Sequence, residues 1–282
     1  MNLIRSVLLH LDGTPSSASR LAFARAVAQH YEAALCVMFV ASPPQHPVTL
    51  AFSESPAALL QPIDPAALDG TRSVFDLALA DGGLPMRWLD SDGTDPVEAF
   101  RTQAPYADLL VLGQRDPAAP SPGNMPSGFV ESVLIGTGKP ALILPFAGRF
   151  EATGRDVLVG WNETPQAARA LSAALPWLHG ARRVHVLEVT DESAQDPTGE
   201  FDIAQYLQLH GIVSALHRHR APPAPAPVPG NAGELLLSFA KKVGAGLLVM
   251  GCYGHNQARE FMLGGASRSV LQTMTLPVLM AH

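Results

Sequence analysis

Four glycines in the last forty residues are spaced in a way that suits the binding of phosphate. Gly251 and Gly254 are three residues apart, and the adjacent pair Gly264 and Gly265 follows further along the chain. An apolar run, LLVM, precedes these glycines and another, LPVLMA, follows them. Glycine lets the backbone approach a ligand without a Cβ clash, and the unpaired N–H groups of a helix that begins near Gly265 attract anions. The spacing predicts a loop that cradles phosphate.

Other reactive side chains give weaker indications. The run HRHR at 217–220 places two histidines on one face of a strand, which suits a metal ion, but no cysteine or acidic cluster stands beside it. We therefore favour a solvated strand end. Cys252 is one of only two cysteines, and no second thiol or base near it in the sequence supports a redox role. Because no triad, Walker A lysine or GxSxG elbow is visible, we assign no catalytic residue and no metal ligand.

The chain contains two copies of one unit. RSVLLHLDGTPSSASRL at 5–21 aligns without a gap on RDVLVGWNETPQAARAL at 155–171, and ADLLVLG at 107–113 matches AGLLVMG at 245–251. The motif SVL followed by a proline also recurs, first at 132–140 and then at 269–277. An internal repeat of this kind predicts two similar domains.

Each copy alternates short apolar runs with helical segments, which is typical of βαβ units and a parallel sheet. We predict strands in the second copy at 156–161, 183–189, 212–218, 246–251 and 277–281, and helices at 164–179, 201–208, 232–243 and 265–273. The first copy carries equivalent strands at 6–11, 35–41, 86–91, 108–113 and 141–145. The expected fold is two tandem doubly wound α/β domains, each a five-stranded parallel sheet in the order 3-2-1-4-5. In such a sheet the ligand lies where the strand order reverses, at the carboxyl ends of the first and fourth strands.

The spacing Gly251-x2-Gly254-x9-Gly264 resembles the nucleotide motif of the universal stress protein family, G-x2-G-x9-G followed by Ser or Thr. The turns LDGTP and WNETP after the first strands are also similar to that family. The likeness covers nearly the whole chain and implies a tandem member with Rossmann-like, adenine nucleotide alpha hydrolase-like domains at 1–148 and 154–282. It implies ATP as the ligand, with ADP and AMP as alternatives and Mg²⁺ carried by the nucleotide.

Carried over residue by residue, the resemblance assigns two groups of ligand contacts. The adenine contacts are Asn162 and Val189, and those to ribose and phosphates are Gly251, Gly254, Gly264, Gly265 and Ser267. Two positions depart from the family pattern, because Gly265 stands where Ser or Thr is usual and Asn162 where Asp is commoner. Ser267 could supply the hydroxyl that Gly265 lacks.

The first copy departs further. Gly113 is kept, but Asp116 replaces the second glycine and four prolines follow in the sequence DPAAPSPGNMP. A carboxylate repels phosphate, and proline has no N–H to donate. We therefore expect the first domain to be a degenerate, structural partner, although Asp12 and Gly13 remain in its first turn.

Composition limits the classes of partner. The chain of 282 residues has a hydrophobic fraction of 47%, a charged fraction of 16% and a net charge of -6, without the basic footprint that nucleic acids require. No apolar run approaches the roughly 20 residues of a membrane span, so we expect a cytoplasmic protein. The leading hypothesis is a nucleotide-binding stress-response protein. The alternatives are a slow Mg²⁺-dependent ATPase and a nucleotide-free scaffold with a vestigial glycine loop.

The fifth strand of each copy makes a further prediction. ALILP at 141–145 and PVLMA at 277–281 are apolar, lack lysine, and are expected at the edge of their sheets, where an open edge invites pairing. Single-domain members of the family dimerise through this region. We therefore expect the two fifth strands to meet, so that the chain forms an internal pseudo-dimer.

Overall fold

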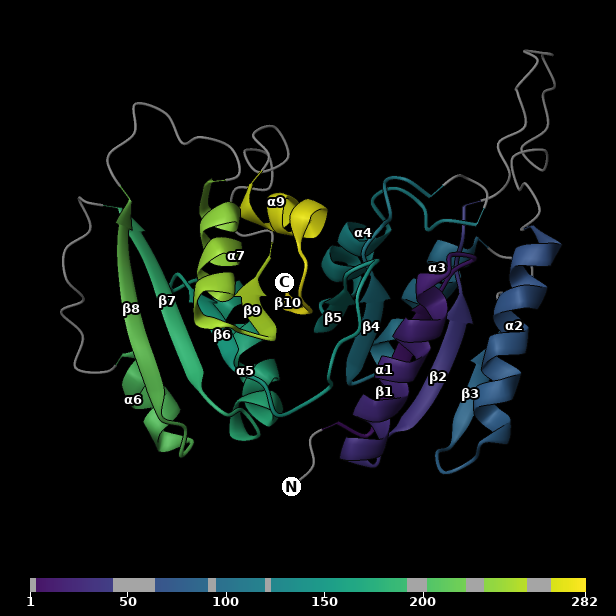
Figure 1. Cartoon of the computed structure of the whole chain (residues 1–282), viewed down its shortest axis with the longest axis horizontal. Helices are drawn as coiled ribbons and strands as arrows, with labels where there is room; N and C mark the ends of the chain where they lie inside the picture. The colour runs from purple at the N-terminus through teal and green to yellow at the C-terminus, as the bar shows by residue number, and fades with distance from the viewer. Residues whose placement is uncertain are drawn as a thin grey trace, which may run out of the picture. The chain divides into compact units, whose positions relative to one another are not determined.

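The computed structural model describes residues 4–42, 64–90, 95–119, 123–191, 202–221, 231–252 and 265–282. The chain divides into two compact units, Met1–Lys139 and Pro140–His282. Each unit is an α/β structure built around parallel strands (Figure 1).

The first unit is a parallel sheet with helices on both faces. Its strands lie in the order β3-β2-β1-β4, and β1 pairs in parallel with both β2 and β4. Helices α1 and α2 contact each other over one face, while α3 and α4 cover the other (Figure 1). The elements are β1 (Ser6–Leu11), α1 (Ser16–Tyr31), β2 (Ala34–Phe39), α2 (Pro65–Ala80), β3 (Met86–Leu89), α3 (Pro96–Gln103), η2 (Ala104–Tyr106), β4 (Leu109–Gly113) and α4 (Phe129–Thr137).

The second unit repeats this plan and adds one strand. Its order is β5-β10-β9-β6-β7-β8, so the strands of the second repeat follow the predicted order 3-2-1-4-5. Helix α5 packs on β6, β9 and β10, whereas α7 and α9 pack together on the opposite face (Figure 1). The elements are β5 (Ala141–Leu144), β6 (Val157–Trp161), α5 (Pro165–His179), β7 (Val184–Asp191), α6 (Ile203–Leu209), β8 (Ser214–Ala221), α7 (Asn231–Val243), β9 (Leu247–Gly251), α9 (Ala266–Thr273) and β10 (Val278–Ala281).

Local sequence explains where the first helix of the second repeat begins and which face it buries. Thr164 is the N-cap of α5 and accepts a hydrogen bond from the backbone N–H of Ala167 at 3.2 Å, while Pro165 takes the first helical position. The buried apolar residues follow at helical spacing: Ala167, Ala170, Leu171, Ala174, Trp177 and Leu178. This stripe presses α5 onto the sheet and aims its N-terminus at the carboxyl ends of the strands.

The fifth strands meet as predicted. Within the second compact unit, β10 pairs with β5 in antiparallel fashion, with Leu279 opposite Leu142. Leu279 is 0% and Leu142 1% exposed. An apolar edge that would attract other chains is thereby paired inside this one.

The predicted fold class is confirmed: the chain is two tandem doubly wound α/β repeats. The predicted strands and helices agree with the observed ones to within a few residues at their ends. A proline-rich stretch at 42–67 follows β2, and its last residues begin helix α2, with Asp64 as the N-cap and Pro65 in the first turn. Residues 43–63 of that stretch, and residues 222–230 of a second proline-rich segment before α7, lie outside the described residues.

Candidate functional site

The strand order defines one equivalent position in each repeat. The first switch point is formed by the carboxyl ends of β1 and β4 with the turn 12–14, and the second by the ends of β6 and β9 with the turn 162–164. At each of them, neighbouring parallel strands send their following connections to opposite faces of the sheet, which opens space for a ligand.

The turn of the second switch point is open to solvent. Asn162 is exposed, and its Oδ1 accepts a hydrogen bond from Thr164 Oγ1 at 2.8 Å. Glu163 between them adopts a left-handed conformation with φ of 53°. Because Thr164 also caps α5, the same hydroxyl orients the Asn162 amide and fixes the start of the helix. The turn therefore presents an oriented amide at the place where the resemblance puts the adenine.

Gly251 ends β9, but its glycine character serves packing. Its φ does not lie in the left-handed region, and a Cβ at this position would stand 2.5 Å from Ala167 N and 2.6 Å from the carbonyl carbon of Gln166. Both atoms belong to the first turn of α5, so only glycine lets the helix approach the strand this closely. From the sequence, glycine is expected here to avoid a Cβ clash with a ligand, whereas the clash that Gly251 avoids in the structure is with the backbone of α5.

The start of α9 supplies backbone donors at the same end of the sheet. Gly265 is its N-cap, with no side-chain hydrogen bond to the first turn. Ser267 is only 3% exposed and already has an interaction within the chain, so its hydroxyl is not displayed to solvent. The N–H groups of this turn suit an anion better than the Ser267 hydroxyl does.

Three other predicted site residues have less structural context. Val189 lies in β7, opposite His219 of β8 in the parallel register. Gly254 and Gly264 lie outside the described residues, as do His255 and Arg259 of the same loop. The structure thus brings together Asn162, Gly251 and the start of α9 at one end of the sheet.

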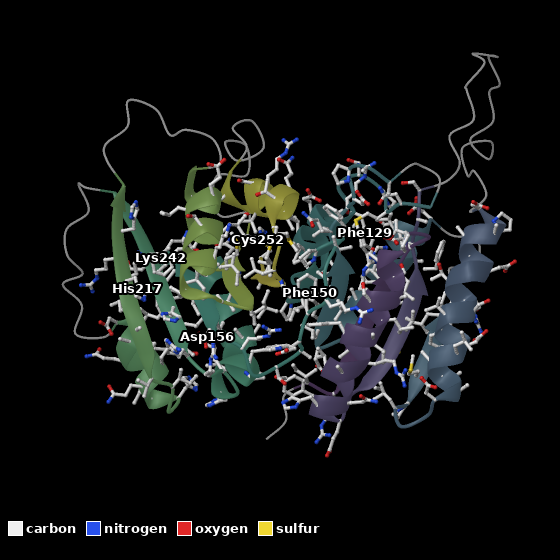
Figure 2. All side chains as sticks on the ribbon, viewed as in Figure 1. Phe129, Phe150, Asp156, His217, Lys242 and Cys252 are labelled. Carbon is white, nitrogen blue, oxygen red and sulfur yellow. The ribbon has the colours of Figure 1, made fainter. Side chains whose placement is uncertain are left out.

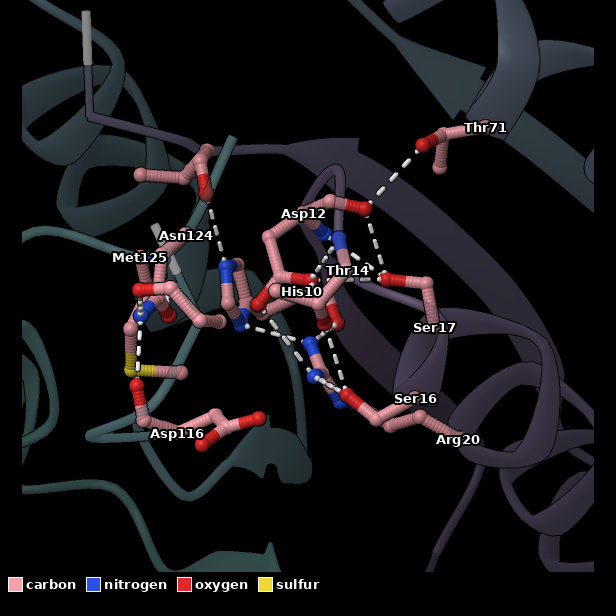
Figure 3. A network of polar contacts seen from close by, with 12 residues as sticks. His10, Asp12, Thr14, Ser16, Ser17, Arg20, Thr71, Asp116, Asn124 and Met125 are labelled. Atoms are coloured by element: carbon pink, nitrogen blue, oxygen red, sulfur yellow. Dashed lines mark hydrogen bonds and ion pairs between the residues drawn. The ribbon is translucent and has the colours of Figure 1, made fainter. Parts of the chain in front are cut away.

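The first switch point is closed. Asp12 is 1% exposed, and one of its carboxylate oxygens accepts hydrogen bonds from Thr14 N at 3.0 Å and Ser17 Oγ at 3.0 Å (Figure 3). The other oxygen pairs with Arg20 Nη2 at 3.3 Å, and the side chain of Arg20 is itself 2% exposed. His10, fully buried behind them, binds the Val40 carbonyl through Nε2 at 2.9 Å.

Burial and neighbouring charge set the protonation of this cluster. Burial, with the Arg20 cation beside it, lowers the pKa of His10 from 6.5 to about 4. For Asp12, burial would raise the pKa, but Arg20, His10 and the hydrogen bonds from Thr14 outweigh it and hold that pKa below its usual value. Neutral His10, ionised Asp12 and Arg20 therefore form a closed set at neutral pH.

Sequence reasoning missed two buried or partly buried residues, Arg20 in the first repeat and His185 in the second. Arg20 lies in α1, eight residues after Asp12, and its place in the repeat is taken by Ala170 in the second copy. A charged residue on the buried stripe of a helix was the available signal. His185 of β7 was also missed, and its Nδ1 lies 3.2 Å from Nε2 of His217 in β8. The two strands were predicted to be neighbours, so this contact could have been inferred.

The ring of His217 packs against Phe239 of α7, with 4.8 Å between the ring centroids, and Lys242 of the same helix lies over the Phe239 ring. Figure 2 labels His217 and Lys242. Nearby, Asp156 is bound by Arg182 through contacts of 2.8 Å and 3.1 Å. Among the described residues, no group of three or more His, Cys, Asp and Glu side chains is placed to hold a metal ion. The histidine pair joins the neighbouring strands β7 and β8.

Known proteins provide an independent comparison. Residues 154–282 match the model of the universal stress protein family. The match covers the second repeat and does not include the first. No curated protein sequence matches the chain.

Solved structures extend the likeness to both repeats. A universal stress protein from Archaeoglobus fulgidus is 17% identical with a TM-score of 0.60, over 99% of this chain and 97% of its own. A putative universal stress protein from Pseudomonas aeruginosa is 18% identical with a TM-score of 0.58, over 98% and 92%. A universal stress protein solved in complex with cAMP is 18% identical with a TM-score of 0.31, over 45% of this chain and 97% of its own. The full-length matches show that the tandem fold is shared.

In the part of the chain that the structure describes, no helix is both long enough and apolar enough to cross a bilayer.

Proposed function

We propose that the second repeat binds one adenine nucleotide and that the protein is a nucleotide-responsive member of the universal stress protein family. ATP is the proposed ligand, with ADP and AMP as related ones and Mg²⁺ entering with the nucleotide. Asn162 and Val189 would contact the base. The glycine motif, Gly251, Gly254, Gly264 and Gly265, with Ser267, would surround the ribose and phosphates.

The contrast between the two turns carries this proposal. Asn162 is exposed at the second switch point, whereas Asp12 at the first is buried and paired with Arg20. Only the second repeat keeps the glycine spacing G-x2-G-x9-G. Among the described residues, no side chain of the N-cap bonds to the first turn of α9, whose backbone N–H groups are donors suited to phosphate.

Two observations favour a second candidate, a nucleotide-free scaffold. The absence of a side chain at Gly251 is explained by its contact with α5 alone, without a ligand. Ser267 is buried rather than displayed. In this alternative the glycine loop is a remnant, and the two repeats serve only as a folded platform.

Calorimetric titration of ATP into the purified chain and into an Asn162→Ala variant separates these candidates. The exposed side chain can be removed without disturbing the core, and loss of one hydrogen-bonding partner of the base should weaken binding about tenfold. Val213→Ala, at a residue that is 92% exposed on the turn before β8, is the matched control and should bind as the parent does. Absence of ATP binding in the parent would support the scaffold.

A further inference from the structure

The space over the end of β4 is filled by a charged side chain of the protein itself. A Cβ built on Gly113 would lie 2.3 Å from Cζ and from Nη2 of Arg20 and 2.7 Å from Nε. The guanidinium of Arg20 therefore covers this glycine directly. Gly113 is the counterpart of Gly251 in the repeat, so the covered place belongs to the first switch point.

Arg20 is held there by groups from the end of β1 and the start of α1 (Figure 3). Nη1 donates to the His10 carbonyl at 3.0 Å and faces His10 Nδ1 at 3.1 Å. Nη2 donates to Ser16 Oγ at 3.0 Å and to Asp12 Oδ2 at 3.3 Å. Because His10 Nε2 uses its proton on Val40, the neutral ring presents Nδ1 as an acceptor to the guanidinium. These groups of His10, Asp12 and Ser16 therefore form a preformed binding site for a planar guanidinium cation.

The second repeat lacks the side chains that make this site. At the aligned positions, Gly160 replaces His10, Asn162 replaces Asp12 and Ala170 replaces Arg20. There the direction of a Cβ on Gly251 is occupied by the backbone of α5. The binding site and its cation are therefore a matched set confined to the first repeat.

We propose that Arg20 is an internal occupant of the first switch point, a side chain that fills a guanidinium site within its own fold and thereby closes this repeat to ligands from solution. The carboxylate of Asp12, at the position that the resemblance gives to the adenine contact, is committed to Arg20 and to the turn. The closed set also ties α1 to β1 and β4 without any bound molecule. This inference does not depend on whether the second repeat binds a nucleotide.

Chemical rescue of Arg20→Ala in the full chain tests the proposal. The truncation leaves Asp12 buried without its cation, which should lower the melting temperature by roughly 10 °C. Methylguanidinium should restore at least half of that loss in a saturable way, whereas methylammonium at the same ionic strength should not. The double variant Asp12→Asn/Arg20→Ala, which carries the residues of the second repeat, should show no rescue. Equal effects of the two cations on Arg20→Ala would overturn the proposal.

A measurement on the unmodified chain keeps the proposal testable if Arg20→Ala does not fold. The closed set should protect backbone amides in the turn of the first switch point, where Gly13 N donates to the Gly123 carbonyl at 2.7 Å and Thr14 N to Asp12. Without added ligand, hydrogen exchange in the turn 12–14 should be at least tenfold slower than in the turn 162–164. Exchange at equal rates would show that the first switch point is no more closed than the second.

Discussion

Replacing Gly251 by alanine tests how the second switch point is held together. The added Cβ would lie 2.5 Å from Ala167 N and 2.6 Å from the carbonyl carbon of Gln166, about 1 Å inside normal contact. Since both are backbone atoms of α5, the helix itself must move. Overpacking of this kind costs about 1–3 kcal/mol. The same movement strains the cap between Thr164 and Ala167 N, which contributes about 1 kcal/mol.

The two effects together should lower the free energy of unfolding by roughly 2–4 kcal/mol. Alanine also reduces the conformational entropy of the unfolded chain, which offsets a few tenths of a kcal/mol of that loss. Urea unfolding should show this as a lower midpoint with an unchanged slope for the second repeat. Gly70→Ala is the matched control, because a Cβ there meets nothing within 4 Å and the residue lies inside α2. It should leave stability unchanged or raise it by up to about 1 kcal/mol. A Gly251→Ala protein as stable as its parent would refute the packing role assigned to this glycine.

Three further predictions follow from buried groups. Leu279→Lys places a charge in β10 opposite β5 and should lower the free energy of unfolding by more than about 4 kcal/mol, as measured by thermal unfolding. Val213→Lys, at an exposed residue, should leave stability unchanged, and a mild effect at Leu279 would contradict the observed strand pairing. The pKa of His10 is lowered from 6.5 to about 4, so the unfolded chain takes up a proton at a higher pH than the folded chain, and about 3 kcal/mol of stability should be lost as the pH falls from 6.5 to 4. The free energy of unfolding, measured by denaturation at several pH values, should depend less on pH in His10→Gln than in the parent. The same pH dependence in both proteins would show that His10 is not the group responsible. Thr164→Ala removes the side-chain cap of α5 and should lower the free energy of unfolding by about 1 kcal/mol. Thr102→Ala is the control, because the Thr102 hydroxyl donates to the Glu98 carbonyl within α3, and equal losses of stability in the two variants would argue against the cap.

Most of the fold follows from periodicity and repetition. The runs VLLHL in β1 and VLVGW in β6 recur in aligned positions, and short apolar runs alternating with helices leave few other arrangements than a parallel sheet. The pairing of β5 with β10 was also predictable, because two apolar edges without lysine must be covered.

The details of the two switch points were less accessible. The glycine of the second, Gly251, suggested a ligand, yet its immediate neighbour is the backbone of α5, a contact that depends on how closely the helix packs. The ion pair of the first switch point joins Asp12 to Arg20 across a strand-to-helix turn. The spacing of these residues in the sequence does not reveal that both are buried. Such outcomes depend on three-dimensional packing, which a linear pattern does not encode.

The measurement that tests the account most directly is the stoichiometry and footprint of ATP on the unmodified chain. Calorimetry should give a saturable isotherm with about one site per chain, and hydrogen exchange should show protection by ATP in the turn 162–164 and at the start of α9. The turn 12–14 should be unaffected by ATP, because Arg20 already closes it. Two sites per chain, or protection confined to the first repeat, would contradict the assignment of the nucleotide to the second.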